Sequence, residues 1–205
     1  MLAPSDDLVA LLVPRVATPR LLLRGFRKGD LDVLAASFGD PESAQFVGGV
    51  VDRRGAWRLL AIGVGLWTLT GTGWWAVEEV ATGELVGTVG AFVRETPSEW
   101  IELGWTVVRS RWGQGIASEA ARAAASFAFE RHAIPRVVAH IDARNIASVR
   151  VSVIPPRPRP PRAAQPSRRQ RPEPRTRRPA AWPRRERLAR DRRAAPCARR
   201  RWFGP

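Results

Sequence analysis

The sequence predicts an α/β domain, and two observations carry this prediction. Strand-like runs alternate with runs whose apolar residues recur three and four positions apart, which is the spacing of an amphipathic helix. In addition, a strand-like run at residues 101–108 leads through a Gly-rich loop directly into a helix-like run. About 150 residues carry this alternation, and a segment of that length forms one domain able to bury a sizeable core.

The first half of the domain is predicted to contain one strand, two helices and a hairpin. Residues 21–26 form the strand, and residues 30–38 and 53–69 form helices because their apolar side chains recur at helical spacing. Residues 74–80 and 85–93 are expected to pair as a hairpin around a Thr-Gly turn.

The second half is predicted to be a strand–helix–strand unit. Residues 101–108 form its first strand, residues 116–132 an Ala-rich helix almost free of helix breakers, and residues 136–142 its second strand. The connecting loop carries Gly113 and Gly115, so several backbone N–H groups there are expected to be unpaired beside the positive end of the helix. Such a loop binds a phosphate readily, although it is also found as a simple turn.

Two familiar phosphate-binding loops are excluded at this position. No Lys follows Gly115, as a P-loop requires, and the third glycine of the dinucleotide fingerprint is missing. The segment Trp112-Gly-Gln-Gly-Ile-Ala117 instead resembles the acetyl-coenzyme A signature of the GNAT acetyltransferases, Gln/Arg-x-x-Gly-x-Gly/Ala, with Trp112 in the first slot. Together with the Ser-Glu-Ala that follows, this segment is similar to the signature in the GNAT branch that contains the N-acetyltransferases of ribosomal proteins.

The resemblance extends over residues 17–151 in the same order and spacing. It includes the segments Thr18-Pro-Arg-Leu-Leu-Leu-Arg24, Gly29-Asp-Leu-Asp32, Asp40-Pro-Glu42 and Asn145-Ile-Ala-Ser148. It implies a mixed, mostly antiparallel twisted sheet flanked by helices. It also implies direct acetyl transfer from acetyl-coenzyme A to an amine, with no metal. The cofactor-binding residues that it implies are Val107, Val108, Trp112, Gly113, Gln114, Gly115, Ile116, Ala117, Asn145 and Ser148.

Two residues are expected to take part in the chemistry. Glu102 lies on the strand before the loop, where family members often carry Glu, and is a base or an amine-orienting carboxylate; a solvated strand-edge carboxylate is the alternative. The family's late Tyr, which protonates the leaving thiolate, has no counterpart because the chain contains no Tyr. In the ribosomal-protein branch a Ser can protonate the thiolate instead, and the resemblance implies Ser148 for this role. His140 is either a proton shuttle or a structural histidine, and Asn145 is also suited to capping a helix.

The sequence also suggests roles for other polar and aromatic residues. Arg109 and Arg111 flank the loop and either pair with coenzyme A phosphates or are ordinary surface charges. Glu119 is expected to support the first helical turn, and His132 to compensate the dipole at the helix end. The indole side chains are expected in the core or in the wall of an acceptor pocket, at Trp67, Trp74, Trp75, Trp100 and Trp105.

The last 54 residues, 152–205, depart from the family's pattern. They contain 18 Arg, 12 Pro, three acidic residues and no Lys, whereas residues 1–151 hold 16 basic and 16 acidic side chains. The formal net charge of +15 therefore comes entirely from this segment. A disordered arm that binds RNA and a Pro/Arg linker are two interpretations. A disordered tail translated out of frame from GC-rich DNA is the third and the one we expect.

An out-of-frame tail would leave the domain without the family's last helix and final two strands. Residues 137–141 would then lie at an open sheet edge. An inactive coenzyme A-binding remnant, or an Arg-rich nucleic-acid binder on the same scaffold, are therefore the alternatives to an active enzyme. The acceptor amine is a protein N-terminus or a small molecule, and nucleic acid would be bound only through the tail.

The remaining composition indicates a cytoplasmic protein without a membrane segment. The single Cys197 leaves no disulfide framework, so a reducing compartment is expected. The longest apolar run, at residues 59–69, is short and broken by glycines, and residues 1–16 lack the basic start of a signal peptide.

Overall fold

The computed structural model describes residues 6–96, 98–132 and 134–152, all of which lie in one compact unit, Met1–Pro158. The expectations for residues 153–205, including the disordered tail that supplies no strand, lie outside the described residues. In the described part of the chain, no helix is both long and apolar enough to cross a membrane.

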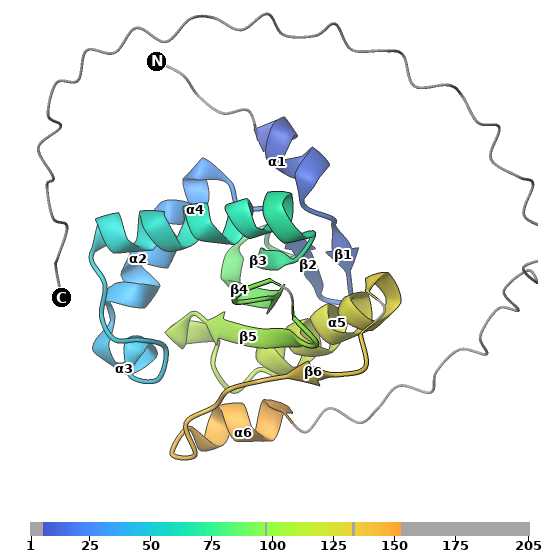
Figure 1. Cartoon of the computed structure of the whole chain (residues 1–205). Helices are drawn as coiled ribbons and strands as arrows, with labels where there is room; N and C mark the ends of the chain where they lie inside the picture. The colour runs from blue at the N-terminus through green and yellow to red at the C-terminus, as the bar shows by residue number, and fades with distance from the viewer. Residues whose placement is uncertain (1–5, 97, 133, 153–205) are drawn as a thin grey trace, which may run out of the picture. The chain divides into compact units, whose positions relative to one another are not determined.

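The strands form one sheet in the order in which they occur along the chain (Figure 1). Four successive pairings are antiparallel, and the last, between β5 and β6, is parallel because a helix crosses over between these two strands. The mixed, mostly antiparallel sheet is thus confirmed. The strands are β1 Val16–Ala17, β2 Leu21–Arg24, β3 Gly73–Glu79, β4 Leu85–Phe92, β5 Ile101–Val107 and β6 Val137–Val138.

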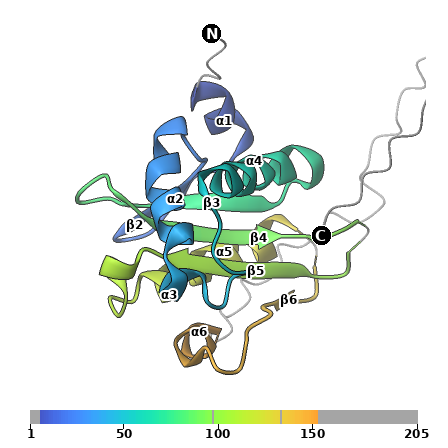
Figure 2. The same cartoon turned by 90° about the vertical axis from the view of Figure 1, so that its left-hand side faces the viewer.

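Helices cover both faces of the sheet; Figure 2 shows α2 and α3 in front of it and α5 behind it. Leu34 of α2 and Leu60 of α4 pack on Ala76, whereas α5 packs its alanines on the opposite face, against Trp75 and its neighbours. The small side chains let α5 lie close to the strands. The helices are α1 Asp6–Leu12, α2 Leu31–Gly39, α3 Pro41–Ala44, α4 Arg53–Thr70, α5 Ile116–Arg131 and α6 Ile146–Ser152.

Local signals explain where the helices begin and end. Asp52 caps α4 by accepting a hydrogen bond from the Gly55 N–H at 2.7 Å, and α4 ends at Gly71, whose φ is 68°. Asp40 caps α3 in the same way through the Ser43 N–H. Helices α2, α4 and α5 match their predicted ranges to within one residue at each end. Helices α1 and α3 and strand β1 were not predicted.

The second strand of the strand–helix–strand unit was predicted too long. Residues 136–142 have strand-like composition, but β6 contains only Val137 and Val138, which pair with Ile101 and Glu102. Beyond that point the chain diverges from β5, so no ladder hydrogen bonds extend the strand. Strand β6 is the last strand of the sheet formed by the described residues.

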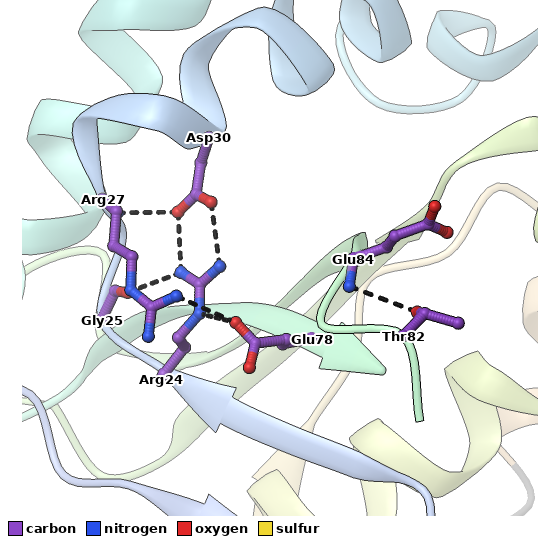
Figure 3. Close-up of polar contacts among 7 residues, drawn as sticks. All are labelled: Arg24, Gly25, Arg27, Asp30, Glu78, Thr82 and Glu84. Atoms are coloured by element: carbon purple, nitrogen blue, oxygen red, sulfur yellow. Dashed lines mark hydrogen bonds and ion pairs between the residues drawn. The ribbon is translucent and has the colours of Figure 1, made fainter. Parts of the chain in front are cut away.

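A buried ion cluster fastens β2 to β3 and to the turn before α2 (Figure 3). The Arg24 side chain, 5% exposed, donates two hydrogen bonds to Asp30 at 2.8 and 2.9 Å and one to Glu78 at 2.6 Å. Burial acts to lower the pKa of Arg24, but these two carboxylates outweigh burial and raise it. The cluster fixes the chain just before Phe26, which lines the cavity described below.

Candidate functional site

The loop between β5 and α5 presents a row of unpaired backbone N–H groups. Gly113 and Gly115 adopt positive φ angles of 75° and 77°, which glycine reaches without strain. The first hydrogen bond of α5 runs from the Glu119 N–H to the Gly115 carbonyl oxygen, and no N–H of residues 113–118 donates to another described residue. Because Ile116 is buried, it can contribute only its backbone. These donors at a helix N-terminus form an anion site.

Arg20 holds this loop in place from the start of β2. Its Nε lies 2.7 Å from Glu119 Oε2, and its guanidinium donates to the Gln114 carbonyl oxygen at 3.0 Å. Glu119 also accepts a 2.6 Å hydrogen bond from the Thr18 hydroxyl. Burial acts to raise the pKa of Glu119, but the hydrogen bonds from Thr18 and Arg20 outweigh it and lower the pKa. Glu119 therefore supports the first turn of α5, as predicted.

Val107 and Val108 differ in whether they can offer a backbone donor. The Val108 N–H donates to the Val86 carbonyl oxygen at 3.0 Å, so the expectation that it serves as a free donor needs correction. Alternation along an antiparallel strand directs the Val107 N–H to the opposite edge, toward the side where β6 diverges. The Val107 carbonyl oxygen accepts a 2.7 Å hydrogen bond from Trp112 Nε1, so Trp112 ties the loop to the end of β5.

A cavity of about 480 Å³ lies on the α2/α4 face of the sheet, beside the divergence of β5 and β6. It brings together three residues singled out from the sequence for chemistry, Glu102, Asn145 and Ser148, and also His140. The loop 109–115 does not line it, so the anion site and the cavity are separate. The apolar side chains of its wall are Phe26, Leu34, Phe38, Phe46, Val47, Leu59, Leu60, Ile62, Trp74, Phe92, Leu103, Trp105 and Ile141.

Glu102 is the buried acid of the cavity, 6% exposed. Arg94 donates two hydrogen bonds to its carboxylate, at 2.5 and 2.6 Å, and His140 Nδ1 lies 3.3 Å from the same carboxylate. Burial acts to raise the pKa of Glu102, but the hydrogen bonds and charge of Arg94, with a contribution from His140, outweigh it and hold the pKa low. Glu102 is thus a paired carboxylate, and the alternative of a solvated edge residue is wrong.

Asn145 and Ser148 occupy the start of α6. Asn145 Oδ1 accepts a 3.1 Å hydrogen bond from the Ser148 N–H, so Asn145 caps this helix. The Ser148 hydroxyl has no hydrogen-bond partner among the described residues, and it lines the cavity. Nearby, hydrogen bonds from Arg144 lower the pKa of Asp142 to about 2.

Arg109 and Arg111 are occupied by surface carboxylates. Arg109 pairs with Asp40 and Glu42, and Arg111 lies 2.8 Å from Glu84. Both guanidinium groups therefore match the surface-charge interpretation better than the phosphate-binding one.

Four of the five tryptophans divide as the sequence predicts between core and cavity, whereas the prediction is wrong for Trp100, which is exposed and does not line the cavity. Trp67 and Trp75 are buried in the core, and Trp74 and Trp105 line the cavity. His132 ends α5, where its backbone N–H donates to Ala128.

Two features of the site were not predicted from the sequence. One is Arg94, whose partner Glu102 follows eight residues later across a connection between strands. The other is a glycine strip: Gly90 and Gly104 pair across β4 and β5, and a Cβ on either would come within 2.6 Å of the Trp74 ring. The alternation of Gly90 and Gly104 with larger strand residues was the available signal, since glycine inside a strand often marks a close approach.

A protein-family model described as an acetyltransferase (GNAT) domain matches residues 20–153. The protein YkkB of Bacillus subtilis (strain 168) is 29% identical over 140 residues, which are 67% of this chain and 81% of YkkB. The uncharacterized N-acetyltransferase YoaA of the same organism is 25% identical over 142 residues, 68% of this chain and 80% of YoaA.

Solved structures share the fold. The acetyltransferase from Agrobacterium tumefaciens str. C58 matches with a TM-score of 0.62 and 29% identity, over 68% of this chain and 80% of that one. RimL, the ribosomal L7/L12 alpha-N-protein acetyltransferase, in complex with coenzyme A matches with a TM-score of 0.59 and 18% identity, over 68% and 81% of the two chains. At that identity the second match shows the fold alone.

Proposed function

The chain belongs to the GNAT acetyltransferase family, and on that premise we propose that it transfers an acetyl group from acetyl-coenzyme A directly to a primary amine. The amine nitrogen attacks the thioester carbonyl, the C–S bond breaks, and the coenzyme leaves as a thiolate that takes up a proton. The observation that carries the proposal is the row of unpaired N–H groups over residues 113–118, at the N-terminus of α5.

Coenzyme A would be held mainly by backbone. Its pyrophosphate fits the anion site, and the glycine positions leave room for phosphate oxygens because a Cβ at Gly113 would meet nothing within 4 Å. The Val107 N–H would then donate to the thioester oxygen, and such a fixed donor contributes on the order of 3 kcal/mol to the transition state. The loop residues assigned to the coenzyme are Trp112, Gly113, Gln114, Gly115, Ile116 and Ala117.

The amine proton would pass to His140, with Glu102 as its positioning residue. A general base works best with a pKa near the operating pH, and the pKa of Glu102 is shifted downward, away from it. His140 Nδ1 lies 3.3 Å from Glu102 Oε2, so the carboxylate would orient the imidazole through Nδ1 and leave Nε2 as the proton acceptor. Glu102 would therefore orient His140, and it would not be the base itself.

Ser148 would donate its hydroxyl proton to the leaving thiolate and would regain a proton from His140, which took it from the amine. Its hydroxyl is free among the described residues, and it shares the cavity wall with His140. Asn145 keeps Ser148 in position by capping the first turn of α6, and its remaining amide N–H groups would face the pantetheine arm.

The proposal is tested with the full chain, acetyl-coenzyme A and an equimolar mixture of simple amines. We expect calorimetry to show binding of acetyl-coenzyme A, and release of free thiol to depend on the amine. Binding without amine-dependent thiol release would identify a coenzyme A-binding remnant. Absence of binding would remove the enzyme assignment altogether.

A further inference from the structure

We propose that the acceptor is a small primary amine with an apolar, aromatic-sized skeleton, of the arylalkylamine type. The inference rests on the proposed function and assigns the substrate class of the same site. The cavity of about 480 Å³ that holds Glu102 and His140 is of the size that encloses most of a small ligand.

The cavity wall separates apolar from polar groups. Helices α2 and α4 and the segment between α3 and α4 contribute the apolar side chains Leu34, Phe38, Phe46, Leu59, Leu60 and Ile62. The polar groups come from β4, β5, the segment after β6 and α6. An amine bound with its nitrogen toward His140 would therefore place its carbon skeleton against the helices.

The floor of the cavity is an aromatic surface. The Trp74 ring lies over the glycine strip formed by Gly90 and Gly104, and it stacks on Phe92 with ring centroids 5.0 Å apart. Because Trp74 is only half-buried and lines the cavity, part of its surface is available to a ligand. An aromatic acceptor would stack on this surface, and a ligand ammonium near the ring face is attracted to it as well.

The charges of the cavity argue against a polycationic acceptor. Its two lining carboxylates are already paired, Glu102 with Arg94 and Asp142 with Arg144. Further ammonium groups of an aminoglycoside would lose water against apolar walls without a free carboxylate among the described lining residues.

The test compares acetyl transfer to 2-phenylethylamine, ethanolamine, kanamycin and a peptide that begins with Ser. We expect kcat/KM to be roughly 10- to 100-fold higher for 2-phenylethylamine than for ethanolamine, the gain that burying a phenyl group gives. Equal rates for these two amines, or faster acetylation of kanamycin or of the peptide, would overturn the assignment. Such results would leave the acetyltransferase proposal intact, whereas failure to bind acetyl-coenzyme A would refute that proposal itself.

A pair of variants on α4 tests whether the apolar skeleton of the acceptor binds in this cavity. Leu59 lines the cavity at its rim and is 45% exposed, whereas Leu69 on the same helix is 82% exposed and outside the cavity. We expect Leu59→Asp to lower kcat/KM for 2-phenylethylamine roughly tenfold, because a charge then faces the apolar skeleton. Leu69→Asp should leave the preference unchanged, and both variants should bind acetyl-coenzyme A like the parent. An equal loss in both variants would contradict the placement of the acceptor.

Discussion

Glu102 illustrates how one residue's environment decides its chemical role. Its carboxylate is buried, held by Arg94 through two hydrogen bonds, and in contact with His140. An acid in this setting stays ionised and orients its neighbours, so we propose as the proton acceptor the more exposed His140, whose side chain is 67% accessible.

Replacing either member of this pair should lower turnover and leave binding of acetyl-coenzyme A unchanged. Glu102→Gln removes the charge that orients His140, and His140→Ala removes the proton acceptor, which typically contributes ~10²–10⁴-fold. We expect His140→Ala to lower kcat by a factor in this range and Glu102→Gln to lower it less, with the acetyl-coenzyme A affinity of the parent in both variants. A kcat equal to that of the parent in both variants would exclude the pair from proton transfer.

The lowered pKa of Glu102 also predicts how stability depends on pH. A carboxylate whose folded pKa lies below its unfolded value, about 4.3, stabilises the fold above that pH, and the contribution is lost as the pH falls through the folded pKa. The parent should therefore exceed Glu102→Gln in stability at pH 7, by about 1 kcal/mol or less because Arg94 is exposed. Urea denaturation at pH 7 and at a series of lower pH values should show this difference shrinking as the pH falls below the unfolded pKa.

Arg24 offers a second comparison of single residues. Arg24→Ala should destabilise the fold by about 3–5 kcal/mol, because it leaves Asp30 as a buried, uncompensated charge and leaves Glu78 with only the exposed Arg27 as its partner. Arg27 binds the same Glu78 but is 46% exposed, so Arg27→Ala should cost about 1 kcal/mol or less. Equal losses in urea denaturation would mean that the burial of Arg24 and its contacts, drawn in Figure 3, do not govern the stability.

At the scale of elements, the β5–α5 loop is where sequence reasoning succeeds most clearly. Gly113 and Gly115 predicted an exposed row of backbone donors, and the structure confirms positive φ at both positions. The two glycines that set the backbone of this loop are neighbours in the sequence, and such local patterns are what a sequence displays.

A matched pair of glycines tests whether the loop binds the coenzyme. Gly113 and Gly83 have φ angles of 75° and 71°, and a Cβ at either meets nothing within 4 Å, so both should tolerate Val with similar backbone strain. We expect Gly113→Val to weaken acetyl-coenzyme A binding at least tenfold and Gly83→Val, in a hairpin turn, to leave it unchanged. Calorimetric titration measures both, and equal affinities would reduce the loop to a turn.

Elements that depend on distant pairing were less predictable. Strand β6 has the composition of a longer strand, but its length is set by where it leaves β5. Val108 was expected by resemblance to bind the cofactor, yet its N–H donates to Val86 on the neighbouring strand. No sequence signal identifies Arg94 as the partner of Glu102. Their pairing depends on the path of the connection between β4 and β5, which brings Arg94 back beside Glu102.

For the whole molecule, the order of the segments predicted the fold and the family, since each motif matched in sequence and spacing. The two helical layers and the sheet then place two sites side by side along β5: an anion site at its end and an apolar cavity beside Glu102. Neither the cavity nor its glycine-supported Trp74 floor follows from any one motif, because both combine residues from β3, β4, β5 and α4.

The most direct measurement of the proposed activity follows the acetyl group itself. The full chain is incubated with trideuterioacetyl-coenzyme A and 2-phenylethylamine, together with the simple amine mixture, and the products are quantified by mass spectrometry. We expect trideuterioacetylated amine and free coenzyme A in equal amounts, and loss of both products in the Gly113→Val protein. Free coenzyme A without acetylated amine, or no turnover although acetyl-coenzyme A binds, would contradict direct transfer to an amine.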